Sequence, residues 1–425
     1  MIGLMFAILG ICLVLGVPVG FAIGISATVY LTGAGFPPLS IIPTKMVDGI
    51  NSFSLLALPL FIISGNIMSY GCTPRLMRFA NMLLGRLPGG LGAAGVASAG
   101  FFGAISGSGV ATTAAVGGLV GPEMVKQGYG KGYTASLLCA GGTLGIVIPP
   151  SLPMVIYCTS ANTSVGRLFL AGVIPGLMTI LSLIIFNVFI AKRRGYGSER
   201  NHYTKKQVIS ITVDALLPLF MPVIILGGVL TGIFTPTESA AVAVIYAFVL
   251  GKFVYRELSF KDLYKVLNES VKSSAIIMFI MACAAPFAWL MATQNIPTLF
   301  ANVILSISSN KAVLMLLISF LLLVLGTFME TNSIIILMTP MLYPIVTGLG
   351  MNPIHFGVLM VMMMAIGGTT PPLAVCLFTS TRAVGITVEE SFPDILYICA
   401  VLVLCYTLAL VFPQIVMTLP ELMMG

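Results

Sequence analysis

Long apolar stretches fill most of this chain, and the interruptions between them recur at a fixed distance. Two proline pairs, Pro149-Pro150 and Pro371-Pro372, each close a Gly/Thr-rich break inside a strongly apolar stretch. The second pair lies slightly more than half the chain length after the first, in a chain of 425 residues. This spacing predicts that the chain contains the same structural unit twice.

A second interruption precedes each proline pair at a matching distance. Segment 103–118 lies before Pro149 and segment 326–333 lies before Pro371, and the two separations along the chain agree to within one position. Interrupted membrane helices in corresponding places of two halves indicate the site of a secondary transporter, because an unwound turn frees carbonyls and helix ends to hold ions. The pattern therefore predicts a carrier with two repeats, 1–205 and 206–425, and a broken helix in each.

Each half also contains a proline-containing apolar stretch that is too short and too interrupted for a clean span, at 58–66 and at 284–295. We expect both stretches to form re-entrant helical hairpins. Backbone that turns inside a membrane must be buried in protein or line a wet cavity. The two hairpin tips and the two broken helices should therefore converge on one central site. The basic residues leave open whether the two halves are parallel or inverted.

The composition requires a membrane environment. Hydrophobic residues make up 58% of the chain, charged residues 8%, and the mean hydropathy is +1.09, so there are too few charges to cover a water-facing surface. At roughly 20 residues per span, we expect an all-α polytopic fold with about ten to twelve spans. The apolar N-terminus predicts an uncleaved first span. The eight cysteines form no CxxC or Cys/His cluster, which favours packing residues over disulfides or a metal site.

The net charge of +7 is concentrated in two basic clusters, 192–206 and 252–272. Short basic loops stay on the cytoplasmic side, so the segment between the clusters should form two spans with an outer turn near 232–237. Residues 256–272 alternate charged with leucine and aromatic side chains at helical spacing, which predicts an amphipathic helix along the membrane surface. The positive-inside bias accounts for the lysines without a nucleic-acid site.

The candidate chemistry lies in segment 103–118, which has small hydroxyl residues and glycines where a span would have Leu and Ile. Glycine allows a helix to unwind, and hard cations prefer oxygen ligands such as carbonyls and hydroxyls. Ser106 and Ser108 flank Gly107, so a broken turn can offer one hydroxyl to Na+ and the other to a substrate. The alternative interpretation of segment 103–118 is that its small residues form a close-packed interface between helices. A phosphate loop is excluded, because no Gly-Lys-Ser/Thr follows.

Two glutamates are candidates for supporting roles. Glu330 lies between two long apolar runs, and an ionisable group at that depth indicates a functional site. It could bind a cation directly, or it could fix the broken turn through bonds from backbone N–H groups. We favour the second role, because the first half has no carboxylate in the matching place. Glu238 follows Pro236 and predicts a helix start, where a carboxylate complements exposed N–H groups.

Four spaced motifs together resemble the large membrane subunit of tripartite ATP-independent periplasmic (TRAP) transporters. They read GAISGSGVAT at 103–112, GIVIPPS at 145–151, GIFTPTES at 232–239 and GGTTPP at 367–372. The resemblance covers essentially the whole chain. It implies an inverted-repeat, elevator-type carrier in the bacterial inner membrane that imports an organic acid such as a C4-dicarboxylate or a sialic acid, driven by Na+. The implied partners are a small four-helix membrane subunit, expected as a separate polypeptide, and a periplasmic substrate-binding protein.

The resemblance also implies roles for individual residues. It implies one sodium site at Ser106, Gly107, Gly145 and Ile148, and a second at Gly326, Met329, Gly368 and Thr370. The implied substrate contacts are Ser108, Thr112, Asn66 and Asn332. The supporting residues are Glu330, Glu238 and the two proline pairs Pro149, Pro150, Pro371 and Pro372. Two or more Na+ ions are expected, with no transition metal and no organic cofactor.

No lysine or arginine occurs in these segments, although the implied substrate is an anion. Half-helix N-termini and bound Na+ ions can supply the positive field. Each charge that crosses the membrane is worth roughly 2.3 kcal/mol per 100 mV, and a dianion carried with two Na+ would gain nothing from the membrane potential. We therefore expect more Na+ ions than substrate charges.

Other functions remain as alternatives. A Na+-coupled carboxylate carrier of similar architecture could work without a binding protein. An intramembrane enzyme would need a nucleophile with a nearby base or paired aspartates, and the broken segments contain hydroxyls and one glutamate. A passive channel would conduct without a Na+ gradient. The sequence does not identify the substrate.

Overall fold

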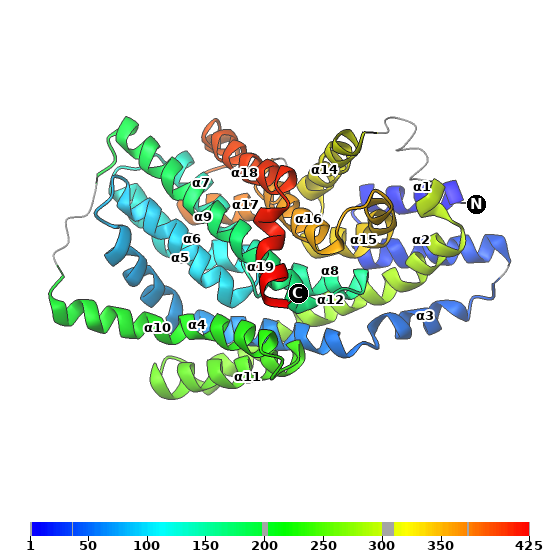
Figure 1. The fold of residues 1–425 in the computed structure, drawn as a ribbon, viewed down its shortest axis with the longest axis horizontal. Coiled ribbons are helices and arrows are strands. Elements are labelled where there is room, and N and C mark those ends of the chain that lie inside the picture. Colours follow the sequence, from blue (N-terminus) through cyan, green and yellow to red (C-terminus); the bar gives the residue numbers. More distant parts are fainter. Residues whose placement is uncertain (1, 36, 198–202, 300–309, 372–373, 425) are drawn as a thin grey trace.

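The computed structural model is built from α-helices (Figure 1). It describes residues 2–35, 37–197, 203–299, 310–371 and 374–424, and these ranges contain no β-strand. The helices of the first half are α1 (Ile2–Val14), α2 (Val19–Ala34), α3 (Ile41–Ile50), α4 (Ala57–Leu84), α5 (Gly90–Ser106), α6 (Gly109–Lys126), α7 (Lys131–Val147), α8 (Leu152–Ala161) and α9 (Val165–Arg194). Those of the second half are α10 (Lys205–Leu230), α11 (Pro236–Val249), α12 (Phe260–Thr293), α14 (Lys311–Phe328), α15 (Thr331–Gly348), α16 (Pro353–Gly367), α17 (Val375–Val384), α18 (Asp394–Val411) and α19 (Gln414–Met424).

The protein is a multi-pass membrane protein. Within the described ranges, 8 helices are long and apolar enough to cross a membrane, or up to 9 spans with the bent pair α7–α8. Helices α1, α2, α5, α16 and α17 are apolar but shorter. The all-helical, polytopic fold is confirmed. The described ranges contain fewer candidate spans than the ten to twelve expected, because several apolar stretches there form shorter helices.

Helices α5 and α6 form a re-entrant hairpin. Gly107 follows α5 with a left-handed φ of 63°, and the extended residue Ser108 then begins α6. Beyond this turn the helices lie side by side, since a Cβ on Gly95 would be 3.2 Å from Cγ1 of Val120. A straight helix would separate these two residues by about 37 Å. The predicted break in 103–118 is therefore present, but the chain reverses direction there instead of continuing.

Helices α14 and α15 form a second, more open hairpin. Met329 is extended between them, and Glu330 begins α15. The ammonium of Lys311, at the start of α14, lies 3.4 Å from the carbonyl oxygen of Gly350, just beyond the end of α15. The chain therefore returns to the side from which it came, and 326–333 is also a hairpin tip.

The first proline pair interrupts a candidate membrane span, and the first residue of the second pair lies just beyond the end of α16. At Pro149-Pro150 the helix axis bends by 42° between α7 and α8. In the second half, α16 ends at Gly367, residues 368–371 are non-helical, and α17 begins at Val375. Pro371 lies in this interruption, and Pro372 lies outside the described residues. Proline lacks the N–H that a helix needs, which accounts for the interruption at Pro149-Pro150.

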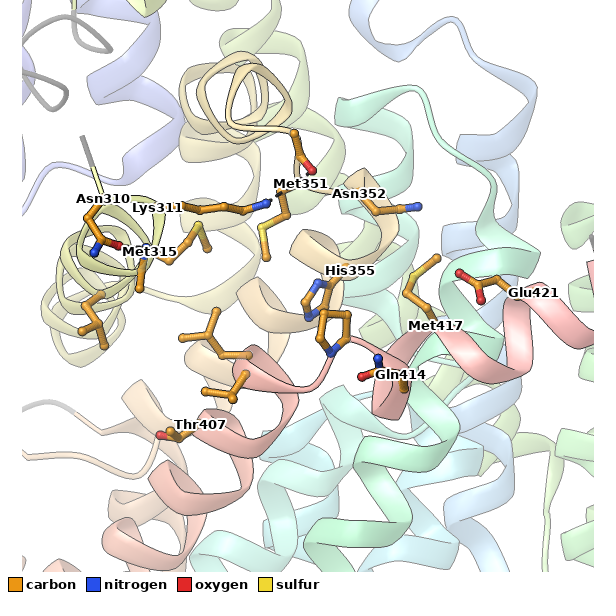
Figure 2. A pocket seen from close by; sticks show the side chains of 16 residues that line it. Asn310, Lys311, Met315, Met351, Asn352, His355, Thr407, Gln414, Met417 and Glu421 are labelled. Atoms are coloured by element: carbon orange, nitrogen blue, oxygen red, sulfur yellow. Dashed lines mark hydrogen bonds between the residues drawn. The ribbon is translucent and has the colours of Figure 1, made fainter. Parts of the chain in front are cut away.

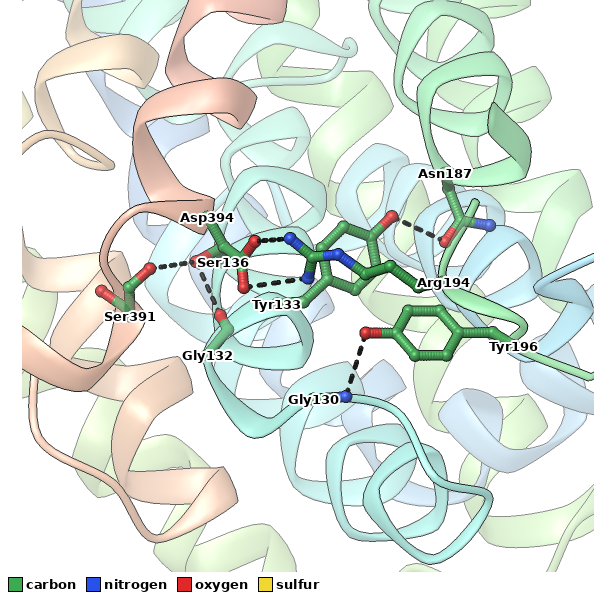
Figure 3. Close-up of polar contacts among 9 residues, drawn as sticks. All are labelled: Gly130, Gly132, Tyr133, Ser136, Asn187, Arg194, Tyr196, Ser391 and Asp394. Carbon is green, nitrogen blue, oxygen red and sulfur yellow. Dashed lines mark hydrogen bonds and ion pairs between the residues drawn. The ribbon is translucent and has the colours of Figure 1, made fainter. Parts of the chain in front are cut away.

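The two hairpins enter the membrane from opposite sides. Arg194, at the basic end of α9, forms an ion pair with Asp394 at the start of α18 and lies over the ring of Tyr133 near the start of α7 (Figure 3). Gly89, just before α5, donates a hydrogen bond to Gly197 on this same side, 3.1 Å away. We call this the inner side, because basic loops stay in the cytoplasm. The first hairpin opens toward it.

The second hairpin opens toward the opposite, outer side. The hydroxyl of Tyr157, on α8, donates to the carbonyl oxygen of Pro353 at the start of α16, 2.7 Å away. Helix α8 ends on the outer side, because α7 begins on the inner side and the pair makes one crossing. The loop that joins α15 to α16 is therefore also outer, as is Lys311. The halves are inverted, which the basic residues alone left open.

The predicted hairpins at 58–66 and 284–295 are wrong. Helix α4 is continuous through the first stretch, and Pro59 lies in its first turn, where a missing N–H costs nothing. The non-helical residues of α4 are Tyr70 and Gly71, further along. Helix α12 is continuous through Pro286 to Thr293. Neighbouring helices in a membrane tolerate such internal prolines.

The amphipathic helix predicted over about 256–272 has different bounds in the structure, and its position along the membrane surface stays a prediction. Helix α12 begins at Phe260 behind a capping box of Ser259 and Asp262 and runs for 34 residues. Its first part is polar and half-exposed, and its second part is apolar. The helical period was correct, but no residue near 272 ends the helix.

The outer turn expected near 232–237 is confirmed. Helix α10 ends at Leu230 and α11 begins at Pro236. The backbone N–H of Thr235 donates to Glu238 Oε2 at 2.7 Å, and the N–H of Glu238 donates to the Thr235 hydroxyl at 3.2 Å. The helix start predicted from Glu238 is thus present, while the division into 1–205 and 206–425 stays a prediction.

Candidate functional site

The tip of the first hairpin is held by hydroxyl groups. The hydroxyls of Ser106 and Thr112 are 2.9 Å apart, and Thr112 also donates to the carbonyl oxygen of Ser108 at 2.7 Å. The Ser108 hydroxyl accepts from the N–H of Ala111 and so caps the start of α6. Thr112 is fully buried, so its side chain stabilises the tip from within the protein.

This tip meets the first proline break directly. The carbonyl oxygen of Gly107 accepts a hydrogen bond from the N–H of Leu152 at 3.3 Å. Pro149 has no N–H to offer the carbonyl of Gly145, four residues earlier, as a helix would require. The Ser151 hydroxyl compensates for the second proline by donating to Ile146 at 2.5 Å. The predicted ion ligands Ser106, Gly107 and Gly145 therefore come together, with an unpaired helical carbonyl at Gly145.

A glycine crossing repeats in both halves. A Cβ on Gly103 would lie 2.7 Å from Cα of Gly145, and one on Gly326 would lie 3.1 Å from Cα of Gly367. The number of residues that separates Gly103 from Gly326 agrees to within one with the number that separates Gly145 from Gly367. The second number also equals the separation of the two proline pairs. Each hairpin arm thus crosses its broken span at backbone contact, which larger residues would prevent. This equivalence supports the duplication predicted from the proline pairs.

The tip of the second hairpin contains a carboxylate. Glu330 Oε2 accepts from the N–H of Ser333 at 3.0 Å, and Oε1 accepts from the side-chain amide of Asn332 at 2.7 Å. These are bonds of the kind expected if Glu330 fixes the turn. The Asn332 side-chain oxygen is buried and has no hydrogen-bond partner among the described residues, so it is an acceptor available to a cation or donor.

The second proline break brings together the remaining predicted ion ligands. Gly326 contacts Gly367, the neighbour of Gly368. Met329 is extended at the tip. The Thr370 hydroxyl donates to the carbonyl oxygen of Ile366 at 2.7 Å, so its hydrogen is already committed.

All four interruptions border one small cavity of about 60 Å³. The first residues of four half-helices line it: Gly109 of α6, Leu152 of α8, Thr331 of α15 and, one residue into α17, Cys376. The same breaks bring the C-terminal ends of α5, α7, α14 and α16 nearby. Helix N-termini carry partial positive charge and C-termini partial negative charge. The centre therefore has fields suited to an anion and to cations without any basic side chain.

A larger cavity of about 990 Å³ adjoins the tips, within the size range of small-molecule sites. Asn66, Ser108 and Asn332 line it, as predicted for substrate contacts, together with Glu330. Thr112 does not reach either cavity. An apolar wall from α2 and α12 completes the lining. Asn66 is also tied to α12 by a 2.9 Å hydrogen bond to the Ser270 hydroxyl.

Ile148 contributes to packing. Its side chain lies against α9, where a Cβ on Gly176 would be 2.7 Å from Ile148 Cγ1. Glu238 lies at the outer surface and is not part of the central site. The described residues contain no group of three His, Cys, Asp or Glu side chains that could hold a metal ion. All eight cysteines are free thiols.

A family model decides the identity of the chain. The model for the DctM component of tripartite ATP-independent periplasmic transporters matches residues 6–415. The chain belongs to this family. It is therefore a subunit of a TRAP transporter, a secondary transporter and not an enzyme.

Several curated TRAP permeases are similar over nearly all of this chain. The large permease protein SiaM of a sialic acid transporter from Vibrio cholerae is 37% identical and covers 100% of this chain and 99% of its own. The C4-dicarboxylate permease DctM of Rhodobacter capsulatus is 33% identical, covering 99% of each chain. The isethionate permease DctMQ of Oleidesulfovibrio alaskensis is 38% identical over 97% of this chain, which spans 65% of DctMQ.

A solved structure shares the fold. The YdaH transporter of Alcanivorax borkumensis, described as having an unusual topology, superimposes with a TM-score of 0.63 over 88% of both chains. The sequences are 14% identical, so the likeness concerns the fold alone.

One residue of this TRAP subunit was missed by the sequence-based site. Gly65 on α4 faces the first tip, where a Cβ would lie 3.0 Å from Cα of Ser106 and 3.1 Å from its carbonyl oxygen. Any larger residue would displace this predicted ion ligand. A glycine inside an apolar helix was the available signal, but the expected hairpin at 58–66 explained it otherwise.

Proposed function

We propose that this chain is the large membrane subunit of a Na+-coupled importer that moves an organic acid anion across the bacterial inner membrane by an elevator mechanism. It would work with a small four-helix membrane subunit and receive substrate from a periplasmic binding protein. The main support is the convergence of four helix N-termini and four C-termini, from two inverted hairpins and two broken spans, on one cavity.

The ion chemistry follows from that convergence. Na+ would be held by carbonyl and hydroxyl oxygens at each tip, one ion near Ser106, Gly107 and Gly145. A second ion would lie near Gly326, Gly368 and the unpaired Asn332 oxygen. Oxygen ligands without formal charge hold a cation weakly enough to release it. The substrate anion would lie in the larger cavity, against the N-termini of α6 and α15.

The packing supports a moving block. Helix α6 packs against α17 and α8 packs against α15, so each hairpin contacts the broken span of the other half. Helices α7 and α16 also pack together at the centre. These elements, with α9 and α18, would move as one body against a scaffold of the remaining helices. The Arg194–Asp394 ion pair would hold its two halves together (Figure 3).

The substrate class rests on the relatives and on the cavity. The relatives named above act on sialic acid, a C4-dicarboxylate and isethionate, which are all acids. The lining combines hydroxyl and amide groups with an apolar wall, and the described lining residues include no lysine or arginine. This lining suits a small organic acid. A carrier of similar architecture that needs no binding protein is the second candidate.

Reconstituted uptake tests the proposal. The chain, its small subunit and loaded binding protein would be combined in proteoliposomes, with an inward Na+ gradient. We expect uptake that requires Na+ and carries inward positive current, because more Na+ ions than substrate charges cross. Electroneutral uptake would refute the stoichiometry, and uptake without Na+ would refute the coupling. Full uptake without binding protein would favour the second candidate.

A further inference from the structure

A groove of about 920 Å³ lies far from the central site, at the outer ends of α14 and α18. Figure 2 shows Lys311 and Met315 on its α14 side, Thr407 on its α18 side and His355 of α16 between them. His355 Nε2 donates to the carbonyl oxygen of Ala409 at 2.9 Å and fixes this floor. The groove does not border either central cavity.

At their outer ends, α14 and α18 are separated by the groove. In the first half, the corresponding helices α5 and α9 pack closely at Gly92, where a Cβ would be 2.5 Å from Oδ1 of Asn187. The separation between Gly103 and Gly326, applied to Gly92, leads to Met315, a larger residue that lines the groove. Helix α14 meets α18 at a deeper level through the Ser319 and Tyr406 hydroxyls, 2.5 Å apart. The residues that the structure describes leave the space outward of that bond unfilled.

The groove has the chemistry of a lipid site. Leu316 and Val411 line it and are each 60% exposed, and both helices are candidate membrane spans with most of their surface unburied. Lys311 lies at the outer rim, and no described carboxylate forms an ion pair with it. An ammonium at the end of a membrane helix is placed to meet a phosphate at headgroup level. Along α14, the distance from Lys311 at the rim of the groove to Ser319, where α14 meets α18, is about 12 Å by helical rise.

We propose that this groove binds one phospholipid of the outer leaflet, with its phosphate at Lys311 and an acyl chain between α14 and α18. The lipid would replace the helix contact that glycines provide in the first half. This inference depends on the membrane fold and not on the substrate or the coupling ion.

Native mass spectrometry of the purified transporter in detergent tests the proposal, with phosphatidylglycerol as the probe and diacylglycerol as a probe without phosphate. We expect one phosphatidylglycerol to bind more tightly than diacylglycerol. Lys311→Gln should weaken phosphatidylglycerol about fivefold, the usual effect of one lysine at a membrane surface, and leave diacylglycerol unchanged. Ala312→Phe should fill the groove and abolish the binding of both probes.

Two matched variants complete the test. Val313→Phe adds the same ring to the neighbouring position, which does not line the groove, and should retain the lipid. Lys261→Gln removes a lysine from the inner side and should also have no effect. The proposal is overturned if Ala312→Phe and Val313→Phe bind phosphatidylglycerol equally. It is also overturned if an Ala312→Cys variant cross-links to the small membrane subunit while the wild type retains no lipid.

Discussion

The two hairpin tips occupy equivalent places in the inverted halves but are built from different groups. The first is closed by neutral hydroxyls, with Thr112 bonded to Ser106 and Ser108, and its arms pack along their length. The second is closed by the carboxylate of Glu330, and its arms diverge. The same backbone arrangement is therefore stabilised in two ways: the first tip by helix packing and neutral hydrogen bonds, and the second by the hydrogen bonds of a carboxylate. Substitutions at matching positions should have unequal effects.

The glycine crossings should give the largest difference. In Gly103→Ala the new Cβ would lie 2.7 Å from Cα and 2.9 Å from N of Gly145, which are backbone atoms that cannot move aside. In Gly326→Ala the closest atom is 3.1 Å away. We expect Gly103→Ala to abolish uptake and to cost about 1–3 kcal/mol of stability, and Gly326→Ala to reduce uptake only partly. Initial uptake rates and thermal unfolding in detergent would measure both.

Gly118→Ala is the control for this pair, because nothing lies within 4 Å of its Cβ position on α6. It should leave uptake unchanged and stabilise the helix slightly. Equal losses in Gly103→Ala and Gly326→Ala would contradict a difference in packing between the halves.

Substitution of Glu330 should separate charge from capping at the second tip. Glutamine keeps an acceptor for the Ser333 N–H, whereas alanine removes it at a typical cost of about 1 kcal/mol. If Glu330 fixes the turn, Glu330→Gln should keep its Na+ dependence within about threefold, and Glu330→Ala should require about fivefold more Na+. Uptake against Na+ concentration measures this. A Glu330→Gln variant as impaired as Glu330→Ala would instead assign the carboxylate to the ion.

The hydroxyl network of the first tip should give a smaller, coupled effect. Ser106→Ala and Thr112→Val each remove the 2.9 Å bond between these residues, and one such bond is worth about 1 kcal/mol. The double variant should therefore lose less than the sum of the single losses in Na+ affinity. Thr113→Val is the matched control, because its hydroxyl donates to Gly109 on the same helix and does not touch Ser106. Additive losses would show that the two hydroxyls act separately.

The sequence located the breaks but not the direction of the chain after them. The proline pairs are recognisable because proline lacks the N–H that continues a helix, and Gly107 because glycine readily adopts the left-handed conformation that ends one. Whether the chain then reverses, as at Gly107, or bends, as at Pro149, depends on which helices pack together. The contact between Gly95 and Val120 joins residues that are far apart in the sequence, and the local pattern of residues does not predict such a contact.

The misplaced hairpins have a related cause. Pro59 and Pro286 were interpreted as breaks, but the first occupies a helix start and the second is tolerated within a long membrane helix. Proline alone therefore did not distinguish a tip from a continuous helix. The site residues at Ser106, Ser108 and Asn332 were placed correctly at interruptions, because there glycine and hydroxyl residues accompany the break.

The smallest expected effect concerns Glu238, which caps α11 at the outer surface as Glu330 caps α15 at the centre. Glu238 accepts from the Thr235 backbone in a capping box, and glutamine can fill the same place in such a box. Glu238→Gln should therefore unfold at nearly the wild-type temperature, and Glu238→Ala slightly below it, because the Thr235 N–H would then bond to water instead. Neither variant should change the Na+ dependence of uptake, since Glu238 lines neither central cavity.

Thermal unfolding in detergent and uptake against Na+ concentration measure the two effects separately. Glu330→Ala and Glu238→Ala each remove a hydrogen bond between a carboxylate and a backbone N–H at the start of a helix. A difference between the two variants in Na+ dependence would therefore arise from where the glutamate lies in the protein and not from the kind of bond that is lost. If Glu238→Ala shifted the Na+ dependence as far as Glu330→Ala does, the effect of Glu238 on Na+ binding would have to be indirect, through changes in helix packing. The carboxylate at the second tip would then have no special relation to the ion, and the contrast between the two tips would rest on their packing alone.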